Sequence, residues 1–301
     1  MTPPPPAPRT ALVVPAVAGD RLTRAPQRGA DQVVVDLEDA VAEDHKPQAR
    51  LDAAAVLAEP GWSGVRVAVR VNGWDSAHTF RDVVEVLTAA PGRVELIVLP
   101  KAESAAQVAG LDLLVTQVER ELGPRAGRVR LAALVESAAG LLALEEVAAA
   151  SDRLSLLVLG PLDLAGDLDV PADDAGPEPL PAPWREDALH RLVLVGRARG
   201  LGVLDGPSFA LTDPGAVRAA ALRARRAGCD GCWVVHPGQV GLVHEAFTPT
   251  EAELERARAV LAALKSGAVG RHDGRMLDTA SARAARALLA RADAHAGPGQ
   301  R

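Results

Sequence analysis

Short apolar runs alternate with longer segments of helical periodicity along most of the chain. The runs are rich in Val and Leu and are mostly apolar at every position, as strands buried on both faces should be. The segments between them are rich in Ala, Arg and Glu, so the alternation predicts strand–helix units around a parallel sheet. The eight runs are Ala11–Val14, Gln32–Val35, Val65–Val71, Val94–Leu99, Val129–Val135, Leu154–Leu159, Leu201–Leu204 and Cys232–Val235.

Charged or polar residues stand on the C-terminal side of nearly every run. In a (β/α)₈ barrel those strand ends meet at one mouth, where the active site lies. A Rossmann sheet is the competing fold, but no G-x-G-x-x-G follows the first run and eight units exceed the usual six. The predicted fold is therefore α/β, a (β/α)₈ TIM barrel. The polar residues are Asp36, Arg70, Lys101, Glu136, Asp163, Asp205 and His236.

The two ends of the chain differ in composition from the eight units. The Pro-rich residues 1–10 predict a disordered tail, residues 11–245 the catalytic barrel, and residues 246–301 a small C-terminal helical extension or lid. In this extension Thr248–Lys265 opens with Thr-Pro-Thr-Glu, which predicts a helix capped by its first threonine. A second helix is expected over Ser281–Ala292, after a Gly-rich connector.

The stretch after the sixth run, DLAGDLDVPADDAGPEPLPAPW, has the composition of a loop. Because it follows the C-terminal end of a strand, we expect it to lie over the mouth of the barrel. Its acidic, Pro-rich part around Asp173–Pro183 is the part expected to shape substrate access.

Composition and charge argue against several kinds of partner. Hydrophobic residues make up 48% and charged residues 24% of the chain, as in globular proteins. The formal net charge of −6 and the lack of a basic run predict no nucleic-acid partner. No 18 apolar residues run together and the tail has no apolar core, so we expect no membrane association and a cytoplasmic protein.

The two cysteines, Cys229 and Cys232, form a C-x-x-C without the second half of a zinc site. They stand where a helix is expected to end and a strand to begin. This position favours buried packing over redox or metal chemistry, so neither cysteine enters the predicted mechanism.

Two carboxylates, Glu136 and Asp163, follow neighbouring strands and should face each other across the mouth. Mg²⁺ prefers one or two protein carboxylates and completes its octahedron with water and substrate, so the pair is a candidate metal site. The alternative is that Glu136 opens one helix and Asp163 caps the next.

Three acids, Asp36, Glu38 and Asp39, crowd the segment after the second run and need a cation or a basic partner. They could hold metal-bound waters, or one of them could cap a helix. Arg70 should point into the mouth, where its planar fork suits a substrate carboxylate or an enolate. A structural ion pair of Arg70 with Asp36 or Glu38 is the alternative, and both roles can hold together.

Other basic residues near the mouth are ambiguous. Lys101 could form a Schiff base, but a solvent-facing or carboxylate-paired lysine is favoured, because a metal site makes an imine redundant. His236 is expected to be a hydrogen-bonded residue of the rim. Arg9, Lys46 and Arg50, with Arg21 and Arg24, could meet the phosphates of coenzyme A, or could belong to exposed helix faces.

Ten short motifs in order resemble the citrate lyase β-subunit-like proteins, which group with malyl-CoA and citramalyl-CoA lyases in the HpcH/HpaI aldolase superfamily. The resemblance extends from about Arg9 to Leu289. One departure is the first strand, which runs into VVPAVAGD where the family usually has P-G-N or similar. The motifs are ADQVVVDLEDAV, KPQAR, VAVRVNG, VLPKAES, ALVESAAGLL, LGPLDLAGDL, LDGPSFALTD, WVVHPGQV, FTP and DGRMLD.

The resemblance implies a TIM barrel with Mg²⁺ held at Glu136 and Asp163, waters anchored near Glu38 and Asp39, and substrate bound by Arg70. It also implies a homo-oligomer, a trimer or a dimer of trimers, in which the segment bearing D-G-x-M-x-D closes over a neighbouring subunit's active site. Asp278 would then be a catalytic acid or base supplied in trans.

The implied reaction is carbon–carbon bond cleavage, or its reverse, in a 3-hydroxy-3-carboxyacyl thioester such as malyl-CoA or citramalyl-CoA. A base removes the hydroxyl proton, glyoxylate or pyruvate leaves, and Asp278 protonates the thioester enolate to the acyl-CoA. A malate synthase or malyl-thioesterase with the same site residues remains an alternative. So do a citrate lyase β subunit that depends on an acyl-carrier protein and an inactive binding homologue, although the C-terminal segment favours a stand-alone CoA enzyme.

Overall fold

The structure, a computed structural model, describes residues 6–125, 128–170, 182–264, 270–272 and 275–295. They divide into two compact units, Ala7–His244 and a C-terminal unit that begins at Glu245 and includes Pro6. Residues 1–5 of the predicted tail and residues 173–181 of the predicted insertion lie outside the described part. Thr10, predicted to belong to the tail, opens the first strand.

The larger unit is a closed barrel of eight parallel strands in sequence order, with β8 beside β1. The predicted (β/α)₈ fold is therefore confirmed. Each predicted run overlaps one strand, with ends that agree to within two residues. The strands are β1 Thr10–Pro15, β2 Gln32–Asp36, β3 Val67–Arg70, β4 Leu96–Leu99, β5 Arg130–Val135, β6 Leu154–Leu159, β7 Gly202–Asp205 and β8 Gly231–Val234.

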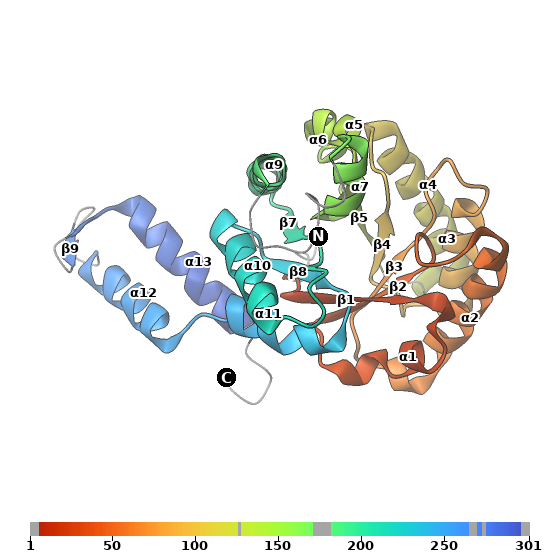
Figure 1. The fold of residues 1–301 in the computed structure, drawn as a ribbon, viewed down its shortest axis with the longest axis horizontal. Helices are drawn as coiled ribbons and strands as arrows, with labels where there is room; N and C mark the ends of the chain where they lie inside the picture. Colours follow the sequence, from red (N-terminus) through yellow and green to blue (C-terminus); the bar gives the residue numbers. More distant parts are fainter. Residues whose placement is uncertain (1–5, 126–127, 171–181, 265–269, 273–274, 296–301) are drawn as a thin grey trace. The chain divides into compact units, whose positions relative to one another are not determined.

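Helices follow the strands and cover the outside of the barrel (Figure 1). In α4, for example, Val108, Leu111 and Val115 are buried at helical spacing, and Ser104 and Gln107 form a capping box at its start. The helices of this unit are α1 Asp20–Thr23, α2 Lys46–Ala58, α3 Thr79–Ala89, α4 Ala105–Leu122, α5 Ala138–Leu142, α6 Leu144–Val147, α7 Pro161–Asp167, α9 Pro183–Arg199 and α10 Pro214–Ala227, followed by α11 Val240–Phe247 at the unit boundary.

Alternate residues of each strand point into the barrel, because the side-chain period of a strand is two. Val34, Ala68 and Leu134 belong to the packed interior. Asp36, Arg70 and Glu136 each lie two residues after one of these core residues, at or just beyond the end of the same strand, and so point the same way. The same alternation that builds the core therefore brings polar side chains to the mouth.

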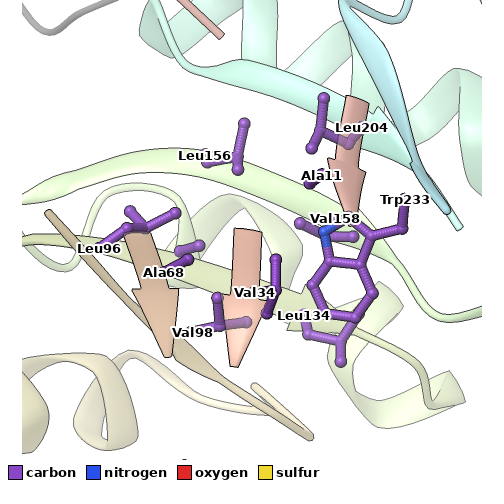
Figure 2. Packing of buried hydrophobic residues seen from close by; sticks show 11 residues of the cluster. Ala11, Val34, Ala68, Leu96, Val98, Leu134, Leu156, Val158, Leu204 and Trp233 are labelled. Atoms are coloured by element: carbon purple, nitrogen blue, oxygen red, sulfur yellow. The ribbon is translucent and has the colours of Figure 1, made fainter. Parts of the chain in front are cut away.

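The interior contains one large ring among small and branched side chains (Figure 2). Trp233 on β8 pairs in register with Ala11 on β1, so the smallest neighbour leaves room for the indole. Leu134 and Val158 belong to the same cluster and lie near the ring in Figure 2. The other members of this cluster are Ala, Val and Leu, which pack closely around the ring.

In the described part of the C-terminal unit, the helices α12 (Glu251–Ala263) and α13 (Thr279–His295) pack side by side (Figure 1). The predicted connector contains an antiparallel hairpin of β9 (Gly270–His272) and β10 (Arg275–Leu277), which the sequence analysis missed. The predicted cap was wrong: Thr250, not Thr248, caps α12 in a capping box with Glu253.

The stretch predicted to be a loop after β6 begins as a helix, because α7 covers Pro161–Asp167. A proline at the first helical position fits this start, since its missing N–H would have no partner there. Among the described residues, no helix combines the length and the apolar character needed to span a bilayer.

Candidate active site

The carboxyl ends of the strands surround an open cavity. Its charged lining consists of Asp39, Arg70, Glu136 and Asp163. A few polar groups beside a wide apolar wall are typical of a small-molecule site. The apolar wall is formed by Val13, Leu134, Leu159, Gly160, Pro161, Leu162, Pro207, Phe209, Trp233 and Val235.

Glu136 is placed by the end of β5 and by a helix cap directly after it. It continues the inward series of Leu134, and Ser137 then accepts a hydrogen bond from the Gly140 N–H at the start of α5. The expectation that Asp163 caps a helix is wrong, because Gly160 precedes α7 and Asp163 lies inside its first turn.

The surroundings of the Glu136 carboxyl group favour its neutral form. The side chain is buried, and the N–H of Lys101 donates to Oε1 over 2.8 Å. Burial first, and then the negative charge of Asp163, raise the pKa of Glu136 to about 8. A cation between the two carboxylates would remove this repulsion.

The donor set fits Mg²⁺. Two carboxylates, one buried and one exposed, line an open cavity with space for water, and Mg²⁺ keeps several waters in most protein sites. In the described part of the chain, no three or more His, Cys, Asp or Glu side chains form a ready-made metal cage. A Mg²⁺ ion held by Glu136 and Asp163 would complete its octahedron with water and substrate.

Arg70, the last residue of β3, lies among three acids: Asp36, which ends β2, and Glu38 and Asp39, which follow it. Its Nε and Nη2 donate to the two oxygens of Asp36, each over 2.7 Å. Its Nη1 lies 2.9 Å from both Glu38 Oε2 and Asp39 Oδ2, and its Cζ lies 5.8 Å from the Trp233 ring centroid. The ion pair that was the alternative role for Arg70 is therefore formed. Its guanidinium also lines the cavity, where it can meet a substrate.

Glu38 and Asp39 interact as a pair. The N–H of Asp39 donates to Glu38 Oε2 over 3.2 Å. Burial raises the pKa of Glu38 to about 7 despite the opposing charge of Arg70. For Asp39, burial is outweighed by the hydrogen bond from Glu38 and by the charge of Arg70, which lower its pKa. Neither acid caps a helix, since the next element is the short 3₁₀ turn Glu43–His45.

Lys101 contacts the acids of the mouth with both its backbone N–H and its side-chain ammonium. Its N–H contacts Glu136, and its Nζ lies 3.4 Å from Glu38 Oε1. Burial lowers the pKa of Lys101, but the charges of Glu38 and Asp39 outweigh it and raise the pKa. A Schiff-base lysine needs the opposite shift, so the carboxylate-paired interpretation is favoured.

Three residues at the mouth have roles that the sequence analysis did not identify. Trp233 and Phe209 line the cavity, and Asn72 lies buried just behind Arg70. The period-two pattern of β8 could have indicated Trp233, whereas Phe209 lies in a loop after β7 and carries no such signal.

The basic residues predicted to contact coenzyme A do not form one group, because Arg9 lies apart from Lys46 and Arg50. Arg9 precedes β1, at the opposite end of the barrel from the cavity, and forms a two-point ion pair with Asp31. Lys46 and Arg50 lie on α2 and are buried against other parts of the protein.

Two further polar residues, one at the end of a strand and one just beyond a strand, lie outside the cavity lining. Asp205, at the end of β7, accepts hydrogen bonds from Arg185. The His236 ring accepts a hydrogen bond from the Gly238 N–H at Nδ1. Cys229 and Cys232 are free and buried, and burial raises the pKa of both thiols, as the packing interpretation expects.

Asp278 belongs to the C-terminal unit, where it precedes α13. Its Oδ1 accepts hydrogen bonds from the N–H and the hydroxyl of Ser281, over 2.9 and 3.0 Å. These bonds, the backbone one first, lower the pKa of Asp278. The carboxylate is therefore fixed in its ionised form at a helix start.

A closed parallel barrel with charged side chains around a cavity at its carboxyl ends defines a (β/α)₈ enzyme. A family model described as HpcH/HpaI aldolase/citrate lyase matches residues 9–237, and the chain belongs to this family.

Two kinds of enzyme are among the similar proteins. The L-malyl-CoA/beta-methylmalyl-CoA lyase of Rhodobacter capsulatus is 37% identical over 89% of each chain. The citrate lyase subunit beta of Haemophilus influenzae is 32% identical, over 94% of this chain and 96% of the relative.

Solved structures agree with this assignment. CitE from Mycobacterium tuberculosis, in complex with magnesium, acetoacetate and coenzyme A, has a TM-score of 0.77 and 31% identity, and the match covers 95% of this chain and 98% of that one. A citrate lyase from Burkholderia xenovorans has a TM-score of 0.87 and 27% identity, over 96% and 92%.

Proposed function

We propose that this chain is a Mg²⁺-dependent carbon–carbon lyase acting on a 3-hydroxy-3-carboxyacyl thioester of the malyl-CoA or citramalyl-CoA type. The products are glyoxylate or pyruvate and an acyl-CoA, and the reverse reaction uses the same site. The observation that carries the proposal is the meeting of Glu136, Asp163 and Arg70 in one cavity. The similarity to malyl-CoA lyases over most of the chain supports it.

The proposed roles follow from the charges around the cavity. Glu136 and Asp163 hold Mg²⁺, which supplies Lewis-acid stabilisation of the developing oxyanion when bound. Arg70 stabilises negative charge on the substrate carboxylate and on the enolate, while Asp36 fixes the orientation of its guanidinium. Glu38 and Asp39 orient water at the mouth.

Proton transfer completes the proposed reaction. A base takes the hydroxyl proton as the carbon–carbon bond breaks, and a proton must then reach the enolate carbon to give the acyl-CoA. We assign both transfers to Asp278 of a neighbouring subunit in a homotrimer or a dimer of trimers: its ionised carboxylate takes the hydroxyl proton and then returns that proton to the enolate carbon. The cytoplasmic location stays a prediction from the sequence.

A citrate lyase β subunit acting on a carrier-bound thioester is the second candidate. The C-terminal extension does not distinguish a CoA-dependent lyase from a citrate lyase β subunit, because the match to the H. influenzae subunit covers 94% of this chain. We favour a CoA thioester on two grounds. The malyl-CoA lyases match with higher identity, and the CitE structure holds coenzyme A together with magnesium.

The test measures release of glyoxylate and pyruvate from malyl-CoA and citramalyl-CoA, with Mg²⁺ and with EDTA. Wild type should release one of them only with Mg²⁺, and Glu136→Ala should lower the rate by at least about 100-fold. Glu95→Ala is the matched control, because Glu95 precedes β4 at the far end of the barrel and pairs with Arg66.

The other outcomes each identify an alternative. Free CoA without a 2-oxo acid would indicate a malyl-thioesterase or malate synthase. Turnover of citryl-carrier protein alone would indicate a citrate lyase β subunit. No turnover of any of these thioesters would contradict the proposal.

A further inference from the structure

Lys46, Asn72, Asp82 and Arg50 form a buried hydrogen-bonded network, here called the relay, next to the acids of the mouth. Its first member is Lys46, in the first turn of α2, whose Nζ donates to the carbonyl oxygens of Leu37 and Glu38 over 3.4 and 3.1 Å. The same ammonium donates to Oδ1 of Asn72, two residues after Arg70. One buried cation therefore joins the segment after β2 to the segment after β3.

The relay continues from Asn72 to α3 and back to α2. Asn72 donates through Nδ2 to the Leu37 carbonyl, over 3.1 Å, and to Oδ2 of Asp82, over 2.6 Å. Arg50 donates through Nη1 to Oδ1 of Asp82, over 3.0 Å, and through Nε to Glu85, over 2.7 Å. Asp82 itself stands in the first turn of α3, where the helix dipole stabilises its charge.

Every member of this relay is buried, with at most 9% of its surface exposed: Lys46, Arg50, Asn72 and Asp82. A buried polar group costs free energy unless it is paired, and a satisfied network fixes the geometry of the groups that it joins. Here the network joins the backbone of Leu37 and Glu38 to Asn72, two residues beyond Arg70. Arg70 and the acids with which it pairs belong to these same two segments.

We propose that Lys46, Asn72, Asp82 and Arg50 are positioning residues that set Glu38 and Asp39 against Arg70. The inference rests on the proposed lyase function for its kinetic consequence. Lys46 and Arg50 act through the acids of the mouth, and not on the phosphates of coenzyme A.

The experiment compares Lys46→Met with Arg153→Met as a matched control. Arg153 is also a well-bonded cation, held by Asp112 and Glu119, but it precedes β6 at the other end of the barrel. Lys46→Met should lower kcat at least about tenfold with KM for the thioester unchanged within about twofold. Arg153→Met should lower the melting temperature at least as much and keep kcat.

A second measurement does not depend on the reaction. Amide hydrogen exchange at residues 37–41 should accelerate in Lys46→Met and stay unchanged in Arg153→Met. Unchanged exchange would overturn the relay even in an active lyase. Accelerated exchange in a protein that cleaves neither thioester would support the relay and reject the lyase.

The kinetic outcomes are equally distinct. A raised KM with unchanged kcat would make Lys46 a substrate contact and overturn the proposal. Equal losses of kcat in both variants would reduce the relay to general stability and overturn it as well. If Lys46→Met does not fold, Asn72→Ser, which keeps the ammonium, should give the same loss of kcat and the same local exchange.

Discussion

A methyl group on Gly160 would lie 2.5 Å from both Cβ and Oε2 of Glu136. The two residues are neighbours because β5 and β6 pair up to Val135 and Leu159, directly before them. Gly160 has φ −100° and ψ 89°, which other residues can adopt, so space rather than backbone freedom requires glycine here. The Glu136 carboxylate occupies the volume that a side chain at position 160 would take.

We therefore expect Gly160→Ala to displace Glu136 and to lower Mg²⁺-dependent turnover by at least about 100-fold, while the barrel stays folded. Gly166→Ala is the control, because Gly166 lies inside α7 and no atom would approach its added methyl group within 4 Å. That change should raise the free energy of unfolding by about 0.5–1 kcal/mol and keep the activity. Turnover and thermal unfolding of both variants check this. Wild-type turnover in Gly160→Ala would mean that Glu136 does not act from its observed position.

Metal binding should also release a proton near neutral pH. The pKa of Glu136 is raised to about 8, so its carboxyl group is mostly protonated at about pH 7 and ionised at about pH 9. Because Mg²⁺ needs the carboxylate, binding should displace about one proton at the lower pH and almost none at the higher one. Calorimetry of Mg²⁺ binding in buffers of different ionisation enthalpy measures this number. Equal proton release at both pH values would contradict the assignment of Glu136.

The sequence predicts the barrel well because parallel strands buried on both faces give continuous apolar runs. It also predicts that Asp36, Arg70 and Glu136 come to one end, since polar residues stand where those runs stop. That is a local signal. The number of units then limits the topology to a closed barrel.

The misplaced predictions depend on partners far away in the chain. Lys46 and Arg50 look like exposed basic residues on a helix, but Asn72 and Asp82 bury them, and no local pattern reveals that contact. Likewise the positive φ of 47° at Lys101, which brings its N–H to Glu136, has no glycine to mark it.

The cap of α12 shows a different limit. Thr248 and Thr250 each have a glutamate three residues later, Glu251 and Glu253, so both satisfy the capping-box pattern. The structure uses the second pair. A local rule that two overlapping sites obey equally cannot choose between them.

The amino ends of the strands carry a cluster whose stability should depend on pH. Arg9 holds both oxygens of Asp31, and His244 Nε2 lies 3.2 Å from Oδ1. Burial alone would raise the pKa of Asp31, but hydrogen bonds from Arg9 and His244 outweigh it and hold the pKa well below its usual range. A pKa below the unfolded value means that the stabilisation is present above about pH 4 and is lost as the pH falls further.

Asp31→Asn should accordingly lower the free energy of unfolding at neutral pH by about 1–3 kcal/mol, and the difference from wild type should shrink in acid. Urea unfolding at a series of pH values measures both quantities. The control is Asp20→Asn, because Asp20 and Arg24 form an exposed pair at 3.6 Å, which should contribute about 0–1 kcal/mol. A difference between Asp31→Asn and wild type that grows in acid would reverse the sign and refute the argument.

The assignment of Asp278 to a neighbouring subunit can be tested by mixing two inactive variants. Glu136→Ala and Asp278→Ala should each be inactive alone, because each lacks one part of every site. Mixed by co-expression, they should recover up to about a quarter of wild-type activity, since random assembly joins an intact Glu136 to an intact Asp278 in that share of sites. If both residues act within one chain, no chain in the mixture has both, and no activity returns. A monomer in gel filtration would likewise remove the basis for supply in trans, because a lone chain has no neighbour to provide the acid.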